Sequence, residues 1–220
     1  VGAGLVSIAT HPEHAAILNL GRPELMCHGV DNVDLLTPLL DKANAIVIGP
    51  GLGQSKWAAE LFIAAIKSDK ALVIDADGLN LLVHIPEKHP NWILTPHPGE
   101  AARLLRCATA DVQQDRFAAI AAIQAKYDGV VVLKGAGTLI AASDEIAVST
   151  TGNPGMASGG MGDVLSGVIA GLMAQGFSRK DAAQQGVYLH GMAGDLAVEQ
   201  LGERGLLASD LMPYLRQLVN

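Results

Sequence analysis

The stretch AIVIGPGLGQSKWAAELFIAAIKSDKALVIDADGLN, residues 45–80, decides the fold of this chain. An apolar run at residues 45–48 ends in glycines, an amphipathic segment follows at residues 56–67, and a second apolar run occupies residues 71–74. Two apolar runs of strand length joined by a helical crossover are typical of parallel strands in an α/β protein. The stretch therefore predicts a βαβ unit.

The same alternation continues on both sides of this unit. The other expected strands are residues 5–9, 92–94, 130–133, 139–142 and 146–148. The other expected helices are residues 32–43, a segment ending near residue 106, residues 115–127 and three helices after the glycine-rich residues 152–162. The last two strands are expected to form a hairpin around residues 143–145. The pattern predicts one α/β domain whose mostly parallel sheet is flanked by helices on both faces.

The chain opens with Val1-Gly2-Ala3-Gly4. We interpret these residues as the end of a helix that runs into the first strand. This interpretation predicts a further strand and helix upstream of residue 1.

The composition excludes several classes of function. Of the 220 residues, 50% are hydrophobic and 17% are charged, which is enough apolar surface for one large core. The net charge is −7 and no basic run is longer than Arg179-Lys180, so non-specific binding to nucleic acid is not expected. No apolar stretch approaches the ~20 residues of a membrane-spanning helix. Cys27 and Cys107 do not make a disulfide framework and are expected to be buried free thiols of a cytoplasmic protein.

Polar and glycine-rich segments follow several of the predicted parallel strands. In open α/β sheets, ligands bind at the carboxyl ends of the strands. We therefore expect a site that is shared among several loops on one rim of the sheet.

The segment Gly155–Asp163 comes directly before a helical run at residues 164–174. Its glycines let backbone N–H groups approach an anion, and a helix start adds unpaired donors and the positive end of the helix dipole. Asp163 stands at this start, where it could take a proton from a substrate hydroxyl. Aspartate is also a preferred helix cap, so on these residues alone the catalytic and the capping interpretations both remain open.

Four further strand ends carry candidate residues. Lys134, followed by small residues to Thr138, could hold a nucleotide, although on these residues alone an ordinary turn with a solvated lysine is the favoured interpretation. His97 lies between two prolines in a stiff loop, and Glu100 can cap the helix that follows. The loop Gly49–Gly53 resembles only half of a dinucleotide fingerprint. Asp75, Asp77 and Asn80 can be explained by turn chemistry as well as by ligand binding.

Taken in order, these segments resemble one family. The motifs are Gly-Pro-Gly-Leu-Gly, Asp-Ala-Asp-Gly-Leu-Asn, Thr-Pro-His-Pro-Gly-Glu, Lys-Gly-Ala-Gly-Thr and Gly-Gly-Met-Gly-Asp. Their order is similar to that of the NAD(P)H-hydrate dehydratases, which are related to ribokinase and hydroxyethylthiazole kinase. The resemblance covers nearly the whole chain. It is strongest to the C-terminal half of the bacterial bifunctional repair protein, whose N-terminal half is an epimerase for the same damaged cofactor.

The resemblance implies a ribokinase-like fold and a reaction. ADP, or ATP, phosphorylates the ring hydroxyl of the S epimer of hydrated NADH or NADPH (NADHX or NADPHX), and phosphate then leaves to restore NAD(P)H. Mg²⁺ is expected with the phosphates. The resemblance also implies a homo-oligomer, such as a tetramer, and fusion to the epimerase. The family normally begins with a further glycine-rich strand and a helix that contact the substrate.

The resemblance also implies roles for single residues. Asp163 matches the catalytic aspartate, which also contacts the hydrated substrate. The anion hole corresponds to Gly160, Met161 and Gly162. The nucleotide-binding residues correspond to Lys134, Gly135, Ala136, Gly137, Thr138 and Gly162. The other substrate contacts correspond to Gly51, Gly53 and His97. Supporting roles are assigned to Asp75, Asn80, Glu100 and Asn153, and no metal ligands are assigned.

Three other functions compete with the dehydratase. A small-molecule kinase of the ribokinase superfamily would use the same anion hole and base but stop after phosphorylating an alcohol, and the Thr-Pro-His-Pro-Gly-Glu segment favours the dehydratase over it. A nucleotide-binding regulator without catalysis is the second, and the intact Gly-Gly-Met-Gly-Asp disfavours it. An NAD-dependent dehydrogenase ranks last because the fingerprint spacing is wrong.

Overall fold

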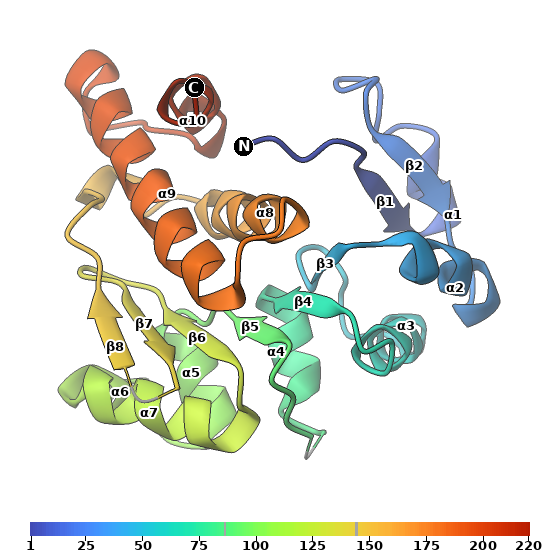
Figure 1. Ribbon diagram of the computed structural model, residues 1–220, viewed down its shortest axis with the longest axis horizontal. Helices are drawn as coiled ribbons and strands as arrows, with labels where there is room; N and C mark the ends of the chain where they lie inside the picture. Colours follow the sequence, from blue (N-terminus) through green and yellow to red (C-terminus); the bar gives the residue numbers. More distant parts are fainter. Residues whose placement is uncertain (86, 144) are drawn as a thin grey trace.

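A six-stranded sheet forms the centre of the protein (Figure 1). The computed structural model describes residues 1–85, 87–143 and 145–220, and every side chain within them except that of Leu201. The strands follow the order β3-β4-β5-β6-β7-β8. β3 to β6 are parallel to one another, and β7 pairs antiparallel with both of its neighbours, β6 and β8. Their bounds are β3 Ala45–Ile48, β4 Ala71–Ile74, β5 Trp92–Leu94, β6 Val130–Leu133, β7 Leu139–Ala142 and β8 Glu145–Val148. The predicted, mostly parallel sheet is confirmed.

Helices cover both faces of this sheet, as expected from its Val-, Ile- and Leu-rich strands. One face carries α2 Val33–Lys42, α3 Lys56–Ile66, α4 Ala76–Leu82, α5 Pro98–Leu105, α6 Thr109–Gln114 and α7 Arg116–Tyr127. The other face carries α8 Met161–Ala174, α9 Arg179–Leu201 and α10 Leu211–Leu218. Short 3-10 turns lie at Pro154–Met156 and Ala208–Asp210.

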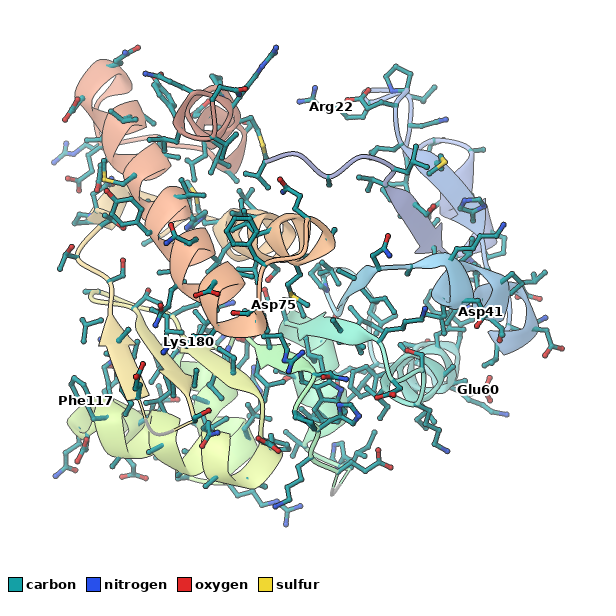
Figure 2. All side chains as sticks on the ribbon, in the orientation of Figure 1. Arg22, Asp41, Glu60, Asp75, Phe117 and Lys180 are labelled. Carbon is teal, nitrogen blue, oxygen red and sulfur yellow. The ribbon has the colours of Figure 1, made fainter. Side chains whose placement is uncertain are left out.

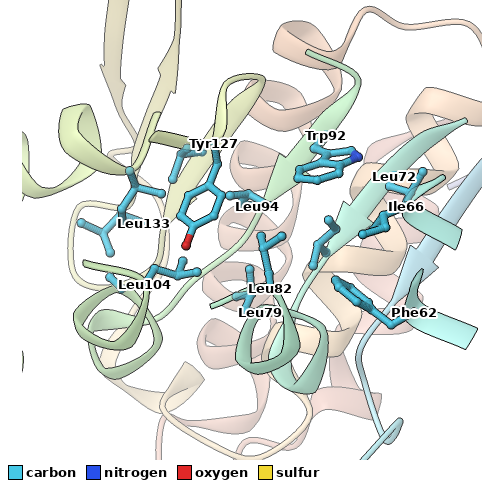
Figure 3. Close-up of a cluster of buried hydrophobic side chains, with 14 of the residues drawn as sticks. Phe62, Ile66, Leu72, Leu79, Leu82, Trp92, Leu94, Leu104, Tyr127 and Leu133 are labelled. Atoms are coloured by element: carbon cyan, nitrogen blue, oxygen red, sulfur yellow. The ribbon is translucent and has the colours of Figure 1, made fainter. Parts of the chain in front are cut away.

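The strands divide their side chains between two cores. In β4, Leu72 and Ile74 point to the α2–α7 face and Val73 points to the α8–α10 face, and all three are fully buried. Figure 3 shows the first core, where Trp92 and Tyr127 pack among leucines. Each such side chain contributes about 1.5–3 kcal/mol by leaving water, so burial on both faces stabilises the strands without polar alternation.

Side-chain caps explain where several helices begin. The side chains of Asn32, Ser55, Asp115 and Ser178 each accept a hydrogen bond from a backbone N–H in the first turn of the following helix. Such caps satisfy donors that a helix start leaves unpaired. The predicted helices at residues 32–43, 56–67 and 115–127 are confirmed within one residue at each end.

The N-terminal region differs most from the prediction. Residues 1–6 form neither helix nor strand, so the interpretation of Val1-Gly2-Ala3-Gly4 as a helix end is wrong. The carbonyl of Val1 instead accepts a hydrogen bond of 2.6 Å from Gln175 Nε2 at the end of α8. The predicted strand at residues 5–9 begins two residues later and ends one residue later, as β1 Ser7–Thr10. It pairs in parallel with β2 Met26–Gly29 in a separate small sheet, beside the short helix α1 Pro12–Ala15.

Other expectations were wrong or fall outside the described residues. Cys107 is exposed and Cys27 is only partly buried, so neither is a buried thiol. The predicted hairpin of β7 and β8 is confirmed in its strands, although its turn includes Asp144, which lies outside the described residues. No helix in the described part of the chain is both long enough and apolar enough to cross a membrane.

Candidate functional site

A buried ion pair lies where the ends of β4 and β6 meet the first turns of α8. Lys134 Nζ lies 2.8 Å from Asp75 Oδ1, and Ser166 Oγ donates a hydrogen bond of 2.7 Å to Asp75 Oδ2. Asp75 is only 1% exposed, and Figure 2 labels it near the middle of the molecule. Its carboxylate also accepts a hydrogen bond of 2.9 Å from the N–H of Ala76. Both carboxylate oxygens of Asp75 thus accept hydrogen bonds, which a buried carboxylate requires.

The Thr-Pro-His-Pro-Gly-Glu loop lies next to this pair. Glu100 Oε2 lies 3.8 Å from Lys134 Nζ and accepts a hydrogen bond of 2.8 Å from the N–H of His97. His97 caps α5, because its Nδ1 accepts from the N–H of Gly99 at 3.0 Å, while its Nε2 faces Glu100 Oε1 at 3.4 Å. The predicted cap by Glu100 is confirmed as a reciprocal capping box. Both ring nitrogens of His97 are thus oriented by its own loop, and half of its side chain remains exposed.

The helix α8 begins earlier than expected. Gly160 is its N-cap residue, with φ of 84°, and Met161 is its first residue. Asp163 is therefore the third residue of the helix, and the interpretation of Asp163 as its cap is wrong. The first N–H groups of a helix lack partners within it, so Met161, Gly162 and Asp163 present donors here.

Gly162 brings this helix start against the buried pair. A Cβ at Gly162 would lie 3.1 Å from Lys134 Nζ and 3.6 Å from Asp75 Oδ2. A side chain would therefore crowd the ammonium group. The structure thus joins the predicted anion hole to Lys134 and Asp75, which are 59 residues apart in the chain.

The carboxyl of Asp163 lies in an environment that favours its protonated form. The residue is exposed, yet partial burial of the carboxyl raises its pKa, and the nearby negative charge of Asp75 raises it further. The charge of Lys134 opposes both effects. A carboxylate with a raised pKa is a better proton acceptor, and it stands beside the donors of the helix start.

The loop Lys134–Thr138 leaves β6 on the same rim. The N–H of Lys134 donates to the carbonyl of Pro96 at 2.9 Å, which ties the loop to the end of β5. Gly135 and Gly137 have φ of 145° and 62°, which only glycine adopts readily. Gly135 and Ala136 are exposed, so the loop is accessible to a ligand.

The loop Gly49–Gly53 is held by Asp77, for which the sequence left turn chemistry and ligand binding both open. Asp77 Oδ2 accepts a hydrogen bond of 2.9 Å from the N–H of Gly53, and Oδ1 accepts one of 3.2 Å from Asn80 Nδ2. Asp77 lies in α4. Gly51 and Gly53 have positive φ and open space around them. Both remain candidates for close approach to a substrate.

Asn80 lies beside a cavity of about 470 Å³ between α4 and α5. Asn80 Oδ1 accepts a hydrogen bond of 2.8 Å from Arg103 Nε, and Gln54, Val83 and His84 complete the lining. None of the residues around the Lys134–Asp75 pair lines this cavity. We therefore identify the candidate site from the positions of its titratable groups and not from this cavity.

Asn153 is not part of the Lys134–Asp75 cluster. Its Nδ2 donates a hydrogen bond of 2.9 Å to Asp195 Oδ1 in α9, and Asp195 Oδ2 accepts another of 2.9 Å from the N–H of Gly152. These contacts hold the segment before the anion hole against α9. Asp195 and Ser166 had no sequence signal, because each acts on a segment far away in the chain.

His190 in α9 is a further buried group that the sequence analysis did not identify. It is 9% exposed, and its Nε2 has no hydrogen-bond partner within the described residues. Burial lowers the pKa of His190 to about 4, the charge of Lys134 lowers it as well, and a hydrogen bond with the Met161 backbone partly opposes them. The imidazole is therefore neutral at pH 7.

This burial predicts a pH dependence of stability. Unfolded His190 binds a proton below pH ~6.5 but folded His190 does not, so stability is complete above that pH and is lost as the pH falls toward 4. Between these values the wild type should lose about 3 kcal/mol more unfolding free energy than a His190→Asn variant. Urea unfolding of both proteins across this range measures the difference. Parallel pH profiles would contradict a buried neutral His190.

Comparison with known proteins supports one family. The NAD(P)H-hydrate dehydratase family matches residues 1–217. The bifunctional NAD(P)H-hydrate repair enzyme of Coxiella burnetii is 58% identical over 221 residues, which cover all of this chain and 45% of that protein. The ADP-dependent (S)-NAD(P)H-hydrate dehydratase of Neisseria meningitidis is 44% identical over 210 residues, covering 91% of this chain and 70% of that protein. The chain thus spans less than half the length of its bifunctional relative.

Solved structures show the same architecture. The ADP/ATP-dependent NAD(P)H-hydrate dehydratase of Bacillus subtilis, co-crystallised with ATP/Mg²⁺, has a TM-score of 0.85 and 29% identity, and covers 99% of this chain and 79% of its own. A ribokinase-like superfamily protein of Enterococcus faecalis has a TM-score of 0.84 and 31% identity, covering 98% and 78%. The predicted ribokinase-like fold is confirmed. With its ordered strand-end motifs and a family match over residues 1–217, the chain belongs to the NAD(P)H-hydrate dehydratase family.

Proposed function

We propose that this chain dehydrates the S epimer of hydrated NADH and NADPH in a reaction that consumes a nucleotide. One observation carries the proposal: Asp163, a carboxylate with a raised pKa, stands in the first turn of α8 beside the Lys134–Asp75 pair. This position supports a proton acceptor next to a helix start that can bind a phosphoryl group. Phosphorylation of a substrate hydroxyl needs both groups.

The proposed reaction has two steps. Asp163 takes the proton of the ring hydroxyl, whose oxygen forms a bond to the terminal phosphorus of ADP while the bond from that phosphorus to the AMP oxygen breaks. The N–H groups of Gly160, Met161 and Gly162 stabilise the charge on the transferring phosphoryl group. In the second step the carbon–oxygen bond to phosphate breaks and the neighbouring ring carbon loses a proton. The ring double bond is restored, and AMP and phosphate are the other products.

The remaining site residues have binding or supporting roles in this proposal. The nucleotide lies along Lys134, Gly135, Ala136, Gly137 and Thr138, and the hydrated ring contacts Gly51, Gly53 and His97. Asp75 and Glu100 support Lys134, because both carboxylates lie within 4 Å of its ammonium group. Asn80 and Asn153 hold segments of the rim.

Mg²⁺ fits this site as an ion carried by the nucleotide. Within the described residues, no three His, Cys, Asp or Glu side chains gather as a metal site. Mg²⁺ commonly uses phosphate oxygens and water with only one or two carboxylates, and Asp75 is the carboxylate that could reach it through water. When bound, Mg²⁺ would neutralise phosphate charge.

Other properties follow from the relatives and remain part of the proposal. One relative is named ADP-dependent and another ADP/ATP-dependent, so we propose ADP as donor and ATP as the alternative. The bifunctional relative supports fusion to an epimerase in the natural protein. We also propose a cytoplasmic homo-oligomer, such as a tetramer.

An assay on the full-length natural protein tests this function. The protein is incubated with (S)-NADHX and Mg²⁺, with ADP, with ATP or without nucleotide, and the absorbance of reduced nicotinamide is followed. We expect recovery only with nucleotide, and one AMP and one phosphate per NADH when ADP is the donor. A phosphorylated hydrate that accumulates without NADH would instead indicate the kinase. Nucleotide binding by folded protein without turnover would indicate the regulator.

A further inference from the structure

The side chain of Arg116 donates hydrogen bonds to the backbone of the Lys134–Thr138 loop and to that of the residue before it. Arg116 is the first residue of α7, and Asp115 caps that helix. Arg116 Nη1 donates a hydrogen bond of 2.5 Å to the carbonyl of Ala136, and Nη2 donates one of 3.3 Å to the carbonyl of Leu133. One planar guanidinium thus holds two carbonyls on either side of Lys134 and Gly135. Arginine suits this role because its donors are fixed in a rigid fork.

The fit between the guanidinium and the loop is close. A Cβ at Gly135 would lie 3.2 Å from Arg116 Nη2, so a side chain there would press on the guanidinium, and the φ of 145° adds backbone strain for any residue but glycine. Arg116 Nε is buried and has no hydrogen-bond partner within the described residues. The side chain therefore gives up hydration at one nitrogen while its other two hold the loop.

The held carbonyls determine where the loop's N–H groups point. Thr138 Oγ1 donates a hydrogen bond of 3.0 Å to the carbonyl of Gly135, and Arg116 holds the next carbonyl, that of Ala136. In a trans peptide the C=O and the following N–H point in opposite directions. The N–H groups of Ala136 and Gly137 must therefore point away from the donors that hold these carbonyls. In the described part of the chain, neither N–H donates to a protein acceptor.

From this geometry we infer that Arg116 is a positioning residue for the nucleotide. Arg116 turns the N–H of Gly137 outward and Thr138 turns that of Ala136 outward, so that a phosphate group of the nucleoside diphosphate meets two successive donors that are already oriented. Successive backbone N–H groups form an anion-binding concavity of this kind. The inference rests on the proposed function, because it assigns the nucleotide to this loop. Arg116 acts through the loop and does not touch the reacting atoms.

Two substitutions distinguish the effect of the two hydrogen bonds from the effect of the positive charge alone. Arg116→Met keeps much of the stem and removes both hydrogen bonds, whereas Arg116→Lys keeps the charge but can hold only one carbonyl firmly. In the full-length protein, we expect the Kd for ADP to rise about 10- to 100-fold in Arg116→Met and about 3- to 10-fold in Arg116→Lys. The KM for the hydrate should stay within about twofold of the wild type, because the loops that bind it are untouched.

Arg179 provides a matched control. It is the first residue of α9, follows the capping residue Ser178 and is partly buried like Arg116. Arg179→Met should leave ADP binding and turnover unchanged. Isothermal titration with ADP and steady-state kinetics are measured on all four proteins, together with their thermal unfolding midpoints.

Each outcome supports or overturns the inference. The inference is supported if ADP affinity falls from the wild type to Arg116→Lys and falls further in Arg116→Met, while the KM for the hydrate stays unchanged. Wild-type ADP affinity in Arg116→Met would overturn it, as would equal losses for ADP and the hydrate. If Arg116→Met does not fold, the Arg116→Lys variant provides the test. Wild-type ADP affinity in Arg116→Lys would show that the charge alone matters and would overturn the inference. A wild-type protein that does not bind ADP would overturn the proposed function and this inference with it, whereas normal wild-type turnover with unaffected variants overturns only the inference.

Discussion

Replacement of Asp163 by asparagine is expected to lower kcat for dehydration of the hydrate by about 10²- to 10⁴-fold. The substitution removes the proton acceptor, whereas the backbone donors of Gly160, Met161 and Gly162 remain in place. The KM for ADP should therefore change little. The expected loss of kcat therefore reflects slower proton transfer and not weaker nucleotide binding.

The same substitution should not destabilise the protein. Because the folded-state pKa of Asp163 is raised, its ionised form is disfavoured in the folded protein, and this cost is complete above the folded pKa and disappears as the pH falls through it. The asparagine variant carries no such charge. Its thermal unfolding midpoint at pH 7 should be no lower than that of the wild type, and any advantage should shrink toward acid pH.

Asp181 offers a control at the equivalent helix position. It is the third residue of α9, as Asp163 is the third residue of α8, and it is also exposed. Asp181→Asn should retain full activity. Stopped-flow and steady-state recovery of reduced nicotinamide measure both variants. Full activity in Asp163→Asn would sink the proposed role, and a marked fall in its unfolding midpoint would indicate a structural role instead.

Replacement of Gly49 by alanine is expected to cost about 4 kcal/mol of unfolding free energy. A Cβ at Gly49 would lie 1.8 Å from the carbonyl oxygen of Asp75 and 2.7 Å from the backbone nitrogen of Gly78. Both neighbours are backbone atoms, one of the N-cap residue of α4 and one of its first turn, so neither can move as a flexible side chain would. The φ of Gly49 is 127°, which adds strain for any residue with a Cβ.

A Gly51→Ala variant distinguishes the steric clash of a Cβ from the backbone strain of a positive φ. It lies in the same loop with a φ of 66°, but a Cβ there would meet no atom within 4 Å. Gly51→Ala should therefore cost only about 1–2 kcal/mol, which is the strain of the left-handed backbone. Urea unfolding of both variants measures the difference. Equal losses would show that φ, and not the close approach of β3 to α4, makes glycine necessary at position 49.

The sequence alone determined the elements whose signals are local. The strands at residues 45–48, 71–74, 92–94, 130–133 and 139–142 have the predicted bounds. Parallel strands buried on both faces appear as continuous Val, Ile and Leu runs, and each helix start capped by Asn32, Ser55 or Asp115 has its cap within the same short segment. By contrast, β2 contains Cys27 and His28 and shows no apolar run, so only its pairing with β1 makes it a strand.

The candidate site could be predicted in its parts but not in its connections. The motifs located Asp163, Lys134 and His97 on one rim, because the carboxyl ends of parallel strands share an edge. Only the tertiary structure joined Asp75 to Lys134 and to Ser166, which lie 59 and 91 residues away, and placed Arg116 under the carbonyl of Ala136. A turn or a cap depends on neighbouring residues, whereas a buried ion pair depends on the order of the strands and on which helix packs against them.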